Sequence, residues 1–407
     1  MILYLIHLII LSCIILAVYT QRGTQFHQSI FWTGLGIRLI GSVSFVLIYT
    51  QYIQYGDSLS FFKKASDLAD SGRSDFVEYL DFVFSSQHHI YKSEGRDGFF
   101  IKLVSVLCLL TNNSYWISTL YMSILSFIPI WYFVSLCASI FPKHKLSLVA
   151  AFLVLPSPIF WTSVLLKDSL VFISIVLITS TLVKYCYKHK IKWLDILGLV
   201  LSFFLLWKLR YFLFGIAFGV VIIVAFEKLI ARRIEKNYYK GFIWLALVVL
   251  CTVGISFINP NLYFQNFPQA IYDNYHIILS NSSPETSIVF RNLQPDWKSL
   301  TFCLPLSFLS GLFRPILTEG GLVYLLHGLE NSLILILSLF TLAKLRRIGR
   351  PPILVWCGIG FILVLASLYP LASPNFGTLM RYKASYLPFL FFLLSITPFQ
   401  AWFQKKA

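Results

Sequence analysis

The chain has 407 residues, of which 57% are hydrophobic and only 12% are charged, and its mean hydropathy is +0.76. A soluble domain carries about 25% charged residues, so this composition excludes a soluble globular domain and indicates that a lipid bilayer is the solvent. The net charge of +16 makes nucleic acid the first partner class to consider.

Apolar stretches of the length that crosses a bilayer recur along the chain. A span needs about 20 mostly apolar residues, and we predict an all-α, polytopic transmembrane helical bundle with about 11 spans. Several are short, which favours helices that stop below one surface and leave a cavity. The predicted spans are 1–19, 30–53, 115–141, 146–163, 169–183, 194–207, 211–226, 242–258, 321–343, 353–370 and 385–400.

Lysine and arginine gather in one set of predicted loops that contains few acidic residues. Cytoplasmic loops carry such an excess, so we place this set in the cytoplasm. The N-terminus and the two longer loops, about 54–98 and 259–298, then lie outside. The basic loops account for the whole net charge, so we expect no nucleic-acid partner. Residues 1–407 show no internal repeat and are predicted to form a single integral membrane domain.

Four shorter segments differ from the spans in pattern. Residues 61–70 and 75–84 repeat apolar side chains at helical spacing, and we predict two amphipathic helices that lie flat on the membrane surface. The stretches 99–111 and 299–316 are apolar but short and interrupted by polar groups. We interpret them as interfacial or re-entrant helices.

The first polar group of interest lies where the second span emerges. Asp57 follows Gly56 at the membrane edge. Polar groups retained near the bilayer usually face a cavity or a partner. A carboxylate here could act as a general base toward a sugar hydroxyl, or hold a metal ion. The alternative is that Asp57 is the N-cap of the following amphipathic helix.

The second group is a Lys-Asp pair in the hairpin 156–168, which we predict to lie outside. Lys167 could bind a phosphate, and Asp168 could orient the phosphate or act on the substrate. The alternative is an ion pair in which the two residues satisfy each other and cap the next helix.

The third group is basic and lies in two parts of the chain. Lys208 and Arg210 fall in the predicted outer turn between 194–207 and 211–226, while Arg381 and Lys383 precede the last span. Basic clusters are expected in cytoplasmic loops, so their presence in predicted outer segments requires an explanation. An anionic ligand supplies one, since guanidinium matches phosphate geometry. The alternative is an anchor for phospholipid headgroups.

The fourth group begins with Arg314 and Glu319, which we add to the substrate-binding candidates. Glu330, one span deeper, should be neutral or paired, and His327 one turn away is a candidate partner.

Two adjacent histidines in the first outer loop, His88 and His89, could act as general acids or as ligands. Neither they nor the seven widely spaced cysteines show metal-binding spacing, so we expect no metal and no cofactor.

These groups resemble a known superfamily. Gly56-Asp57-x-x-x-Phe61-Phe62 is similar to the first outer loop of the GT-C membrane glycosyltransferases. That resemblance implies an acidic residue that acts on the acceptor and a polyprenyl-phosphate sugar donor. This chain departs from the superfamily in carrying the acid after the second span and in lacking an Asp-x-Asp or Glu-x-Asp motif.

Two further motifs resemble membrane proteins of bacterial surface-polysaccharide gene clusters. They are the segment from Pro156 to Asp168 and the Asn-Phe-Gly-x-x-x-Arg-Tyr-Lys segment that ends at Lys383. Such proteins are grouped with O-antigen (oligosaccharide repeat-unit) polymerases or GT-C enzymes, so the resemblance leaves a single-sugar transferase and a polymerase open.

The hypothesis from sequence is a glycosyltransferase in the bacterial inner membrane with its active face outside the cytoplasm. Its partners would be polyprenyl-(di)phosphate-linked saccharide, membrane lipids and other polysaccharide-assembly membrane proteins. Asp57 and Asp168 are the catalytic candidates. The alternatives from other classes are a transporter or flippase for the same lipid-linked sugars, and a purely structural scaffold.

Overall fold

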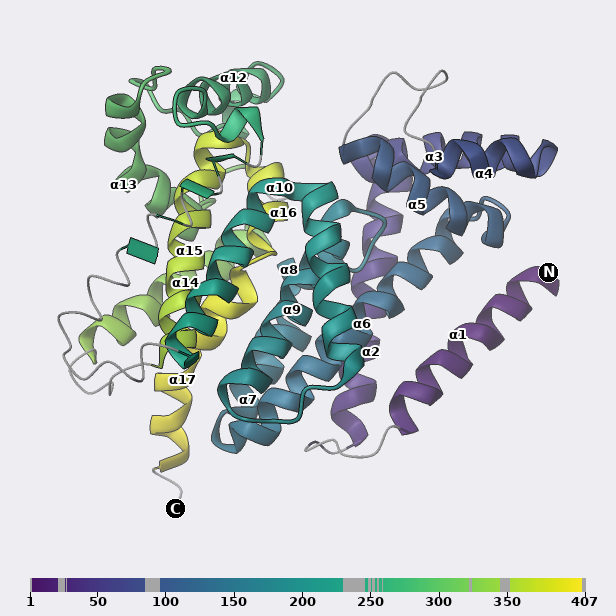
Figure 1. Cartoon of the computed structure of the whole chain (residues 1–407), viewed down its shortest axis with the longest axis horizontal. Helices are drawn as coiled ribbons and strands as arrows, with labels where there is room; N and C mark the ends of the chain where they lie inside the picture. The colour runs from purple at the N-terminus through teal and green to yellow at the C-terminus, as the bar shows by residue number, and fades with distance from the viewer. Residues whose placement is uncertain are drawn as a thin grey trace. The chain divides into compact units, whose positions relative to one another are not determined.

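The computed structural model describes residues 2–20, 26, 28–84, 96–229, 246–247, 250, 253–254, 256–257, 259–321, 324–344 and 352–404. Over these residues the regular structure is helical, with no strand and one isolated bridge between Ser287 and Asn375 (Figure 1). The all-α prediction is confirmed for this part of the chain.

The first half of the chain contains most of the short elements. In chain order they are α1 (Ile2–Thr20), α2 (Gln28–Leu47) with the π-helix Ile48–Ile53, α3 (Asp57–Ser74), α4 (Phe76–Phe84), α5 (Arg96–Thr111), α6 (Tyr115–Ile140), α7 (Lys145–Val149) with the π-helix Ala150–Val154, α8 (Pro156–Thr162), α9 (Lys167–Cys186) and α10 (Trp193–Leu229).

The second half follows with α12 (Phe267–Ser280), α13 (Trp297–Phe313), α14 (Leu325–Ala343), α15 (Ile353–Ala372), α16 (Phe376–Lys383) and α17 (Leu387–Gln404). Short 3₁₀ turns cover Pro142–His144, Pro260–Leu262 and Pro284–Thr286.

Seven of the described helices are long and apolar enough to cross a membrane. An eighth span is possible if Pro142–Val154 and Pro156–Thr162, bent by 45° at their junction, count as one. The chain is therefore a multi-pass helical membrane protein.

The difference from about 11 predicted spans has identifiable sources. Predicted spans 194–207 and 211–226 are the two helical arms of α10, which meet at a kink with non-helical backbone at Arg210 (φ −150°, ψ 77°) and are counted together as one long apolar segment, Trp193–Leu229. Predicted span 242–258 lies mostly outside the described residues. The apolar part of the last helix, Leu387–Ile396, is shorter than a span.

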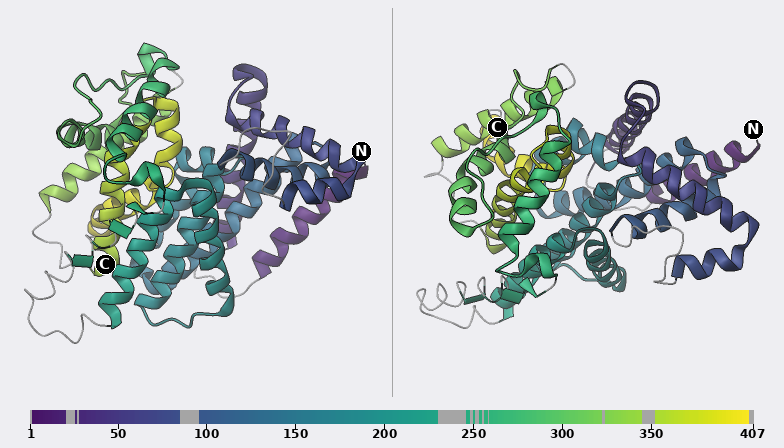
Figure 2. Two further views of the ribbon diagram at one scale, coloured as in Figure 1. Left: turned by 45° about the horizontal axis from the view of Figure 1, so that its top comes forward. Right: turned by 90° about the horizontal axis from the view of Figure 1, so that it is seen from above.

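The chain divides into two compact units. Unit 1 comprises Met1–Leu177 and Leu197–Arg210, and unit 2 comprises Ile178–Ile196 and Tyr211–Ala407. Figure 2 gives two further views of the helices within each unit. The boundary between the two units in α10 falls at the non-helical residue Arg210.

In unit 1, α2 packs against α6 and α8, and α3 packs against α5. The helices predicted at 61–70 and 75–84 are confirmed as α3 and α4. Helix α3 buries Phe61, Ala65, Leu68 and Ala69, which recur at the spacing of one helix face. The rings of Phe61 and Phe100 meet edge to face with centroids 5.3 Å apart and join α3 to α5.

In unit 2, α13 and α15 pack closely enough to exclude a side chain at Gly311. A Cβ built there would lie 2.8 Å from the carbonyl carbon of Ala366. The loop after α12 is joined to the link between α15 and α16, since the Ile288 amide donates to Pro374 O at 2.8 Å. These contacts fix the start of α16, where Asn375 caps the helix by accepting from the Gly377 amide at 2.9 Å.

Candidate functional site

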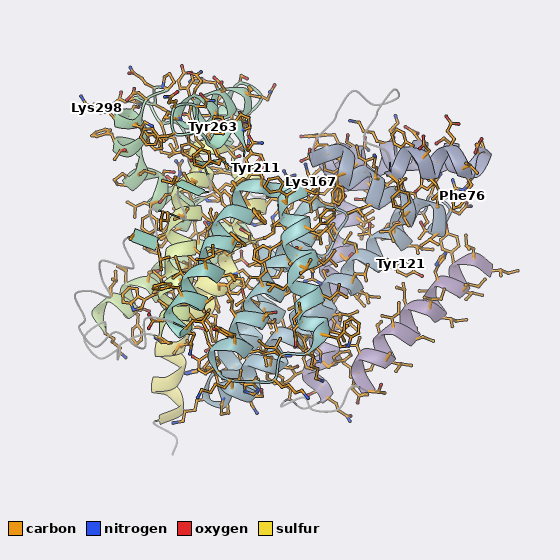
Figure 3. The ribbon with its side chains drawn as sticks, in the orientation of Figure 1. Phe76, Tyr121, Lys167, Tyr211, Tyr263 and Lys298 are labelled. Atoms are coloured by element: carbon orange, nitrogen blue, oxygen red, sulfur yellow. The ribbon has the colours of Figure 1, made fainter. Side chains whose placement is uncertain are left out.

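The N-terminus of α9 carries two charged residues, Lys167 and Asp168, that form ion pairs with other helices. Lys167, labelled in Figure 3, donates to a carboxylate oxygen of Asp97 on α5, and Arg210 donates to a carboxylate oxygen of Asp168. Lys167 and Asp168 thus bind partners on different helices rather than each other. Both predicted residues belong to one charged network that joins α5, α9 and the break in α10.

The two ion pairs of this network differ in burial. The side chains of Arg210 and Asp168 are 8% and 7% exposed. Buried charges of this kind are paired, because a lone one carries a large desolvation cost. Lys167 and Asp97 are 19% and 55% exposed, so their pair lies at the edge of the network and is accessible to an anion.

Two more lysines approach each other beside this network. Lys102 on α5 and the exposed Lys208 on α10 repel each other electrostatically. Burial, with the charge of Lys208 as a second cause, lowers the pKa of Lys102. Lys102 Nζ also lies 5.0 Å from the centre of the Phe82 ring. Like charges held close together favour the binding of an anion between them.

Asp57 is the first residue of α3, and Gly56 (φ 127°) occupies the N-cap position. The predicted N-cap role therefore falls to Gly56, while Asp57 is exposed in the first turn. Residues four apart on a helix are neighbours, so Asp57 lies about one turn from Phe61. Lys167 Nζ lies 4.8 Å from the centre of the Phe61 ring. Asp57 is thus about one helix turn from a residue that contacts Lys167.

The predicted candidates of unit 2 form a second group around the end of α13. Arg314 Nε donates to both carboxylate oxygens of Glu319, at 2.9 and 3.1 Å. Glu319 also accepts from the Ile316 amide at 2.9 Å. The guanidinium lies 5.2 Å from the centre of the Phe376 ring. Arg314 and Glu319 therefore bind each other and close the turn after α13.

Lys383 is completely buried, and its ammonium group is surrounded by oxygen atoms. It donates to Leu312 O at 3.0 Å, Arg314 O at 3.2 Å and Asn331 Oδ1 at 2.7 Å. Its three N–H groups are thus used within the protein, so we do not carry Lys383 into the phosphate-binding set. The Glu330 carboxylate attracts this ammonium group electrostatically. Glu330 therefore interacts with Lys383 of α16, in addition to the candidate partner His327 considered from sequence.

The remaining predicted residues have less structural context. Arg381 is partly exposed, with its guanidinium 5.4 Å from the centre of the Tyr382 ring. His88 and His89 lie outside the described residues. The candidates fall into one group in each unit, and the charged network of unit 1 is the candidate functional site.

Sequence reasoning missed two members of this site, Asp97 and Lys102. Both lie at or just before the apolar stretch 99–111, which was interpreted only as interfacial or re-entrant. The available signal was their placement on one short predicted helix beside the loop 54–98, which was predicted to lie outside. Comparison of the chain with protein-family models, with curated proteins and with solved structures finds no match.

Proposed function

We propose that this chain is a membrane glycosyltransferase that uses polyprenyl-phosphate- or polyprenyl-diphosphate-linked saccharide. The observation that carries the proposal is the gathering of basic side chains at the unit 1 network and beside it. Lys102, Lys167, Lys208 and Arg210 come from three helices, and the described ion pairs join Lys167 to Asp97 and Arg210 to Asp168. Such a gathering of basic groups suits a phosphate or diphosphate ligand.

The apolar surroundings favour a lipid as the carrier of that phosphate. Lys167 begins α9, Lys208 and Arg210 lie at the break in α10, and Lys102 lies inside α5; all three helices are rich in apolar side chains that a hydrocarbon tail can contact. A polyprenyl (di)phosphate combines the two properties that such a site selects, an anionic head and a long apolar tail.

The exposed carboxylate of Asp57 supplies the second requirement of glycosyl transfer, a base. In the proposed step Asp57 accepts the proton of the acceptor hydroxyl, and the hydroxyl oxygen bonds to the anomeric carbon. The bond from that carbon to the phosphate oxygen breaks, and its electron pair leaves with the (di)phosphate. The cationic network stabilises the charge on this leaving group.

The finer features follow the same proposal. The chain would adopt a GT-C-like bundle of about 11 spans, act as a single-sugar transferase or as a repeat-unit polymerase, and work at the extracytoplasmic face of a bacterial inner membrane. Arg381 of unit 2 remains a predicted contact for the lipid-linked substrate.

The direct test uses purified full-length protein in lipid nanodiscs with a synthetic polyprenyl-diphosphate-linked oligosaccharide and a free acceptor. We expect glycosyl transfer by the wild type and a loss of at least about 100-fold in Asp57→Asn, in line with general-base contributions. Asp81→Asn is the matched control, because Asp81 is an exposed carboxylate of the same outer segment. Full activity in Asp57→Asn would remove this residue from the mechanism.

A transporter of lipid-linked sugars is the second candidate, and the broken helices favour it. Transporters often bind substrate at interrupted helices, and this chain has the 45° bend before α8 and the break at Arg210. The nanodisc assay separates the two functions, because it contains no gradient and one accessible compartment. Transfer under these conditions identifies an enzyme, and binding without transfer favours the transporter.

A further inference from the structure

A buried arginine lies deep in unit 1. Arg38 on α2 is 3% exposed and makes all of its described hydrogen bonds to uncharged oxygen atoms. Its Nε donates to Ser123 O and Ser126 Oγ, both at 3.2 Å. Its Nη2 donates to Ser126 Oγ and Thr162 O, both at 2.6 Å, and to Thr162 Oγ1 at 3.2 Å. Arg38 thus connects α2 with α6 and with the last residue of α8.

Thr162 is followed by four residues, 163–166, that join α8 to α9 and that we call the elbow. Elbow residues Ser163, Val164 and Leu165 are 0% exposed. The elbow is closed on itself, since the Leu166 amide donates to Val164 O at 2.7 Å and Ser169 Oγ donates to the same oxygen at 2.6 Å. Lys167 follows the elbow directly as the first residue of α9, so the path of the elbow determines where the charged network begins.

A cation at this place has a specific physical role. The last carbonyl groups of a helix have no partner within the helix, and they carry the negative end of its dipole. The guanidinium of Arg38 meets that end of α8 at Thr162 O and is held from the other side by Ser126. An apolar side chain at position 38 would leave these oxygen atoms buried without a donor, and the end of α8 would be free to shift.

We infer that Arg38 is a positioning residue that fixes the elbow and thereby the placement of Lys167 and Asp168. This inference rests on the proposed function only where it predicts ligand binding, because the effect on the elbow is a property of the fold. Arg38 itself is buried and does not touch the ligand.

The test has two readouts on the full-length protein in nanodiscs. The first is amide hydrogen exchange of residues 162–169, which reports local opening of the elbow. The second is the affinity for undecaprenyl phosphate, measured against uncharged undecaprenol. Arg38→Met should speed exchange in the elbow and weaken undecaprenyl phosphate binding by at least about tenfold, since small misplacements of binding groups have large effects.

Arg38→Lys and Lys184→Met complete the design. Arg38→Lys keeps the charge and loses the planar guanidinium group. We therefore expect a rate of amide hydrogen exchange in the elbow that is intermediate between those of the wild type and Arg38→Met, and an affinity for undecaprenyl phosphate within about threefold of the wild type. Lys184 is a buried cation at the other end of α9, where it donates to both carboxylate oxygens of Asp195 at 2.9 and 2.8 Å. Lys184→Met should therefore leave elbow exchange and lipid binding unchanged.

The outcomes separate the inference from the proposed function. Unchanged elbow exchange in Arg38→Met overturns the inference, and so does faster exchange spread evenly over α2, α6 and α8. A wild type that binds undecaprenyl phosphate no better than undecaprenol overturns the proposed function, while elbow exchange still decides the role of Arg38. If Arg38→Met does not fold, Ser126→Ala replaces it, because this variant removes the hydroxyl that holds both nitrogens. Unchanged elbow exchange in Ser126→Ala then overturns the inference.

Discussion

Replacing Lys383 by methionine tests whether this lysine stabilises unit 2 rather than binding a ligand. The substitution keeps an unbranched apolar stem and removes the ammonium group. Leu312 O, Arg314 O and Asn331 Oδ1 then lose a donor that lies 2.7 to 3.2 Å away. The buried carboxylate of Glu330 loses its attraction to the same group.

The expected loss of stability is large. Leaving a buried hydrogen-bond acceptor without its donor costs about 1–3 kcal/mol, and three acceptors lose the same donor here, so we expect a loss of about 3–5 kcal/mol. A change of 1 kcal/mol shifts the melting temperature of a unit of this size by about 2–4 °C, so Lys383→Met should melt about 6–20 °C lower. Thermal unfolding of the purified full-length protein, followed by tryptophan fluorescence, measures the shift.

Two comparisons make this result decisive. Lys298→Met is the matched control, because Lys298 is an exposed lysine of the same unit, and its effect should stay within about 0.5 kcal/mol (Figure 3). The double variant Lys383→Met/Glu330→Gln should recover part of the loss, because it removes the uncompensated carboxylate. A Lys383→Met variant as stable as Lys298→Met would refute the structural role of Lys383.

Two further predictions concern packing and charge. Gly311→Ala should destabilise the protein by about 1–3 kcal/mol in thermal unfolding, because the added methyl group meets the Ala366 carbonyl carbon at 2.8 Å. Gly360→Ala, where nothing lies within 4 Å, should not destabilise it. Undecaprenyl phosphate binding should weaken as pH rises toward 10.5, because the lowered pKa of Lys102 removes its positive charge earlier than that of an ordinary lysine. In Lys102→Arg, binding measured from pH 7 to 10 should lose this decline.

Helix positions followed from the sequence because apolar length and periodicity are local properties. The predicted amphipathic segments 61–70 and 75–84 correspond to α3 and α4, and predicted span 353–370 corresponds to α15. The predicted turn near Arg210 corresponds to the break in α10. Partners across the fold are not local properties. Asp97 lies 70 residues before its partner Lys167, and no spacing in the sequence connects them.

The Lys167–Asp168 pair shows that one error in predicting interaction partners could have been avoided from the sequence. Adjacent residues on a helix do not face each other, so two neighbours of opposite charge are poorly placed to pair. The side chains of Lys167 and Asp168 at the start of α9 therefore point in different directions. Asp168 turns to buried Arg210, and Lys167 turns to the more exposed Asp97. Helix geometry alone argues against the mutually satisfied ion pair considered from sequence.

The same geometry explains why each predicted pair of charged residues divides into a structural member and an accessible one. Residues two apart on a helix point in nearly opposite directions, so Arg381 and Lys383 cannot both face one ligand from α16. The member that turns inward forms buried contacts, and its neighbour stays at least partly accessible. The inward members are Asp168, Arg210 and Lys383. The accessible members are Lys167, Lys208 and Arg381. An anionic substrate can be contacted directly only by the accessible members, so the inward ones act on it through the positions that they fix.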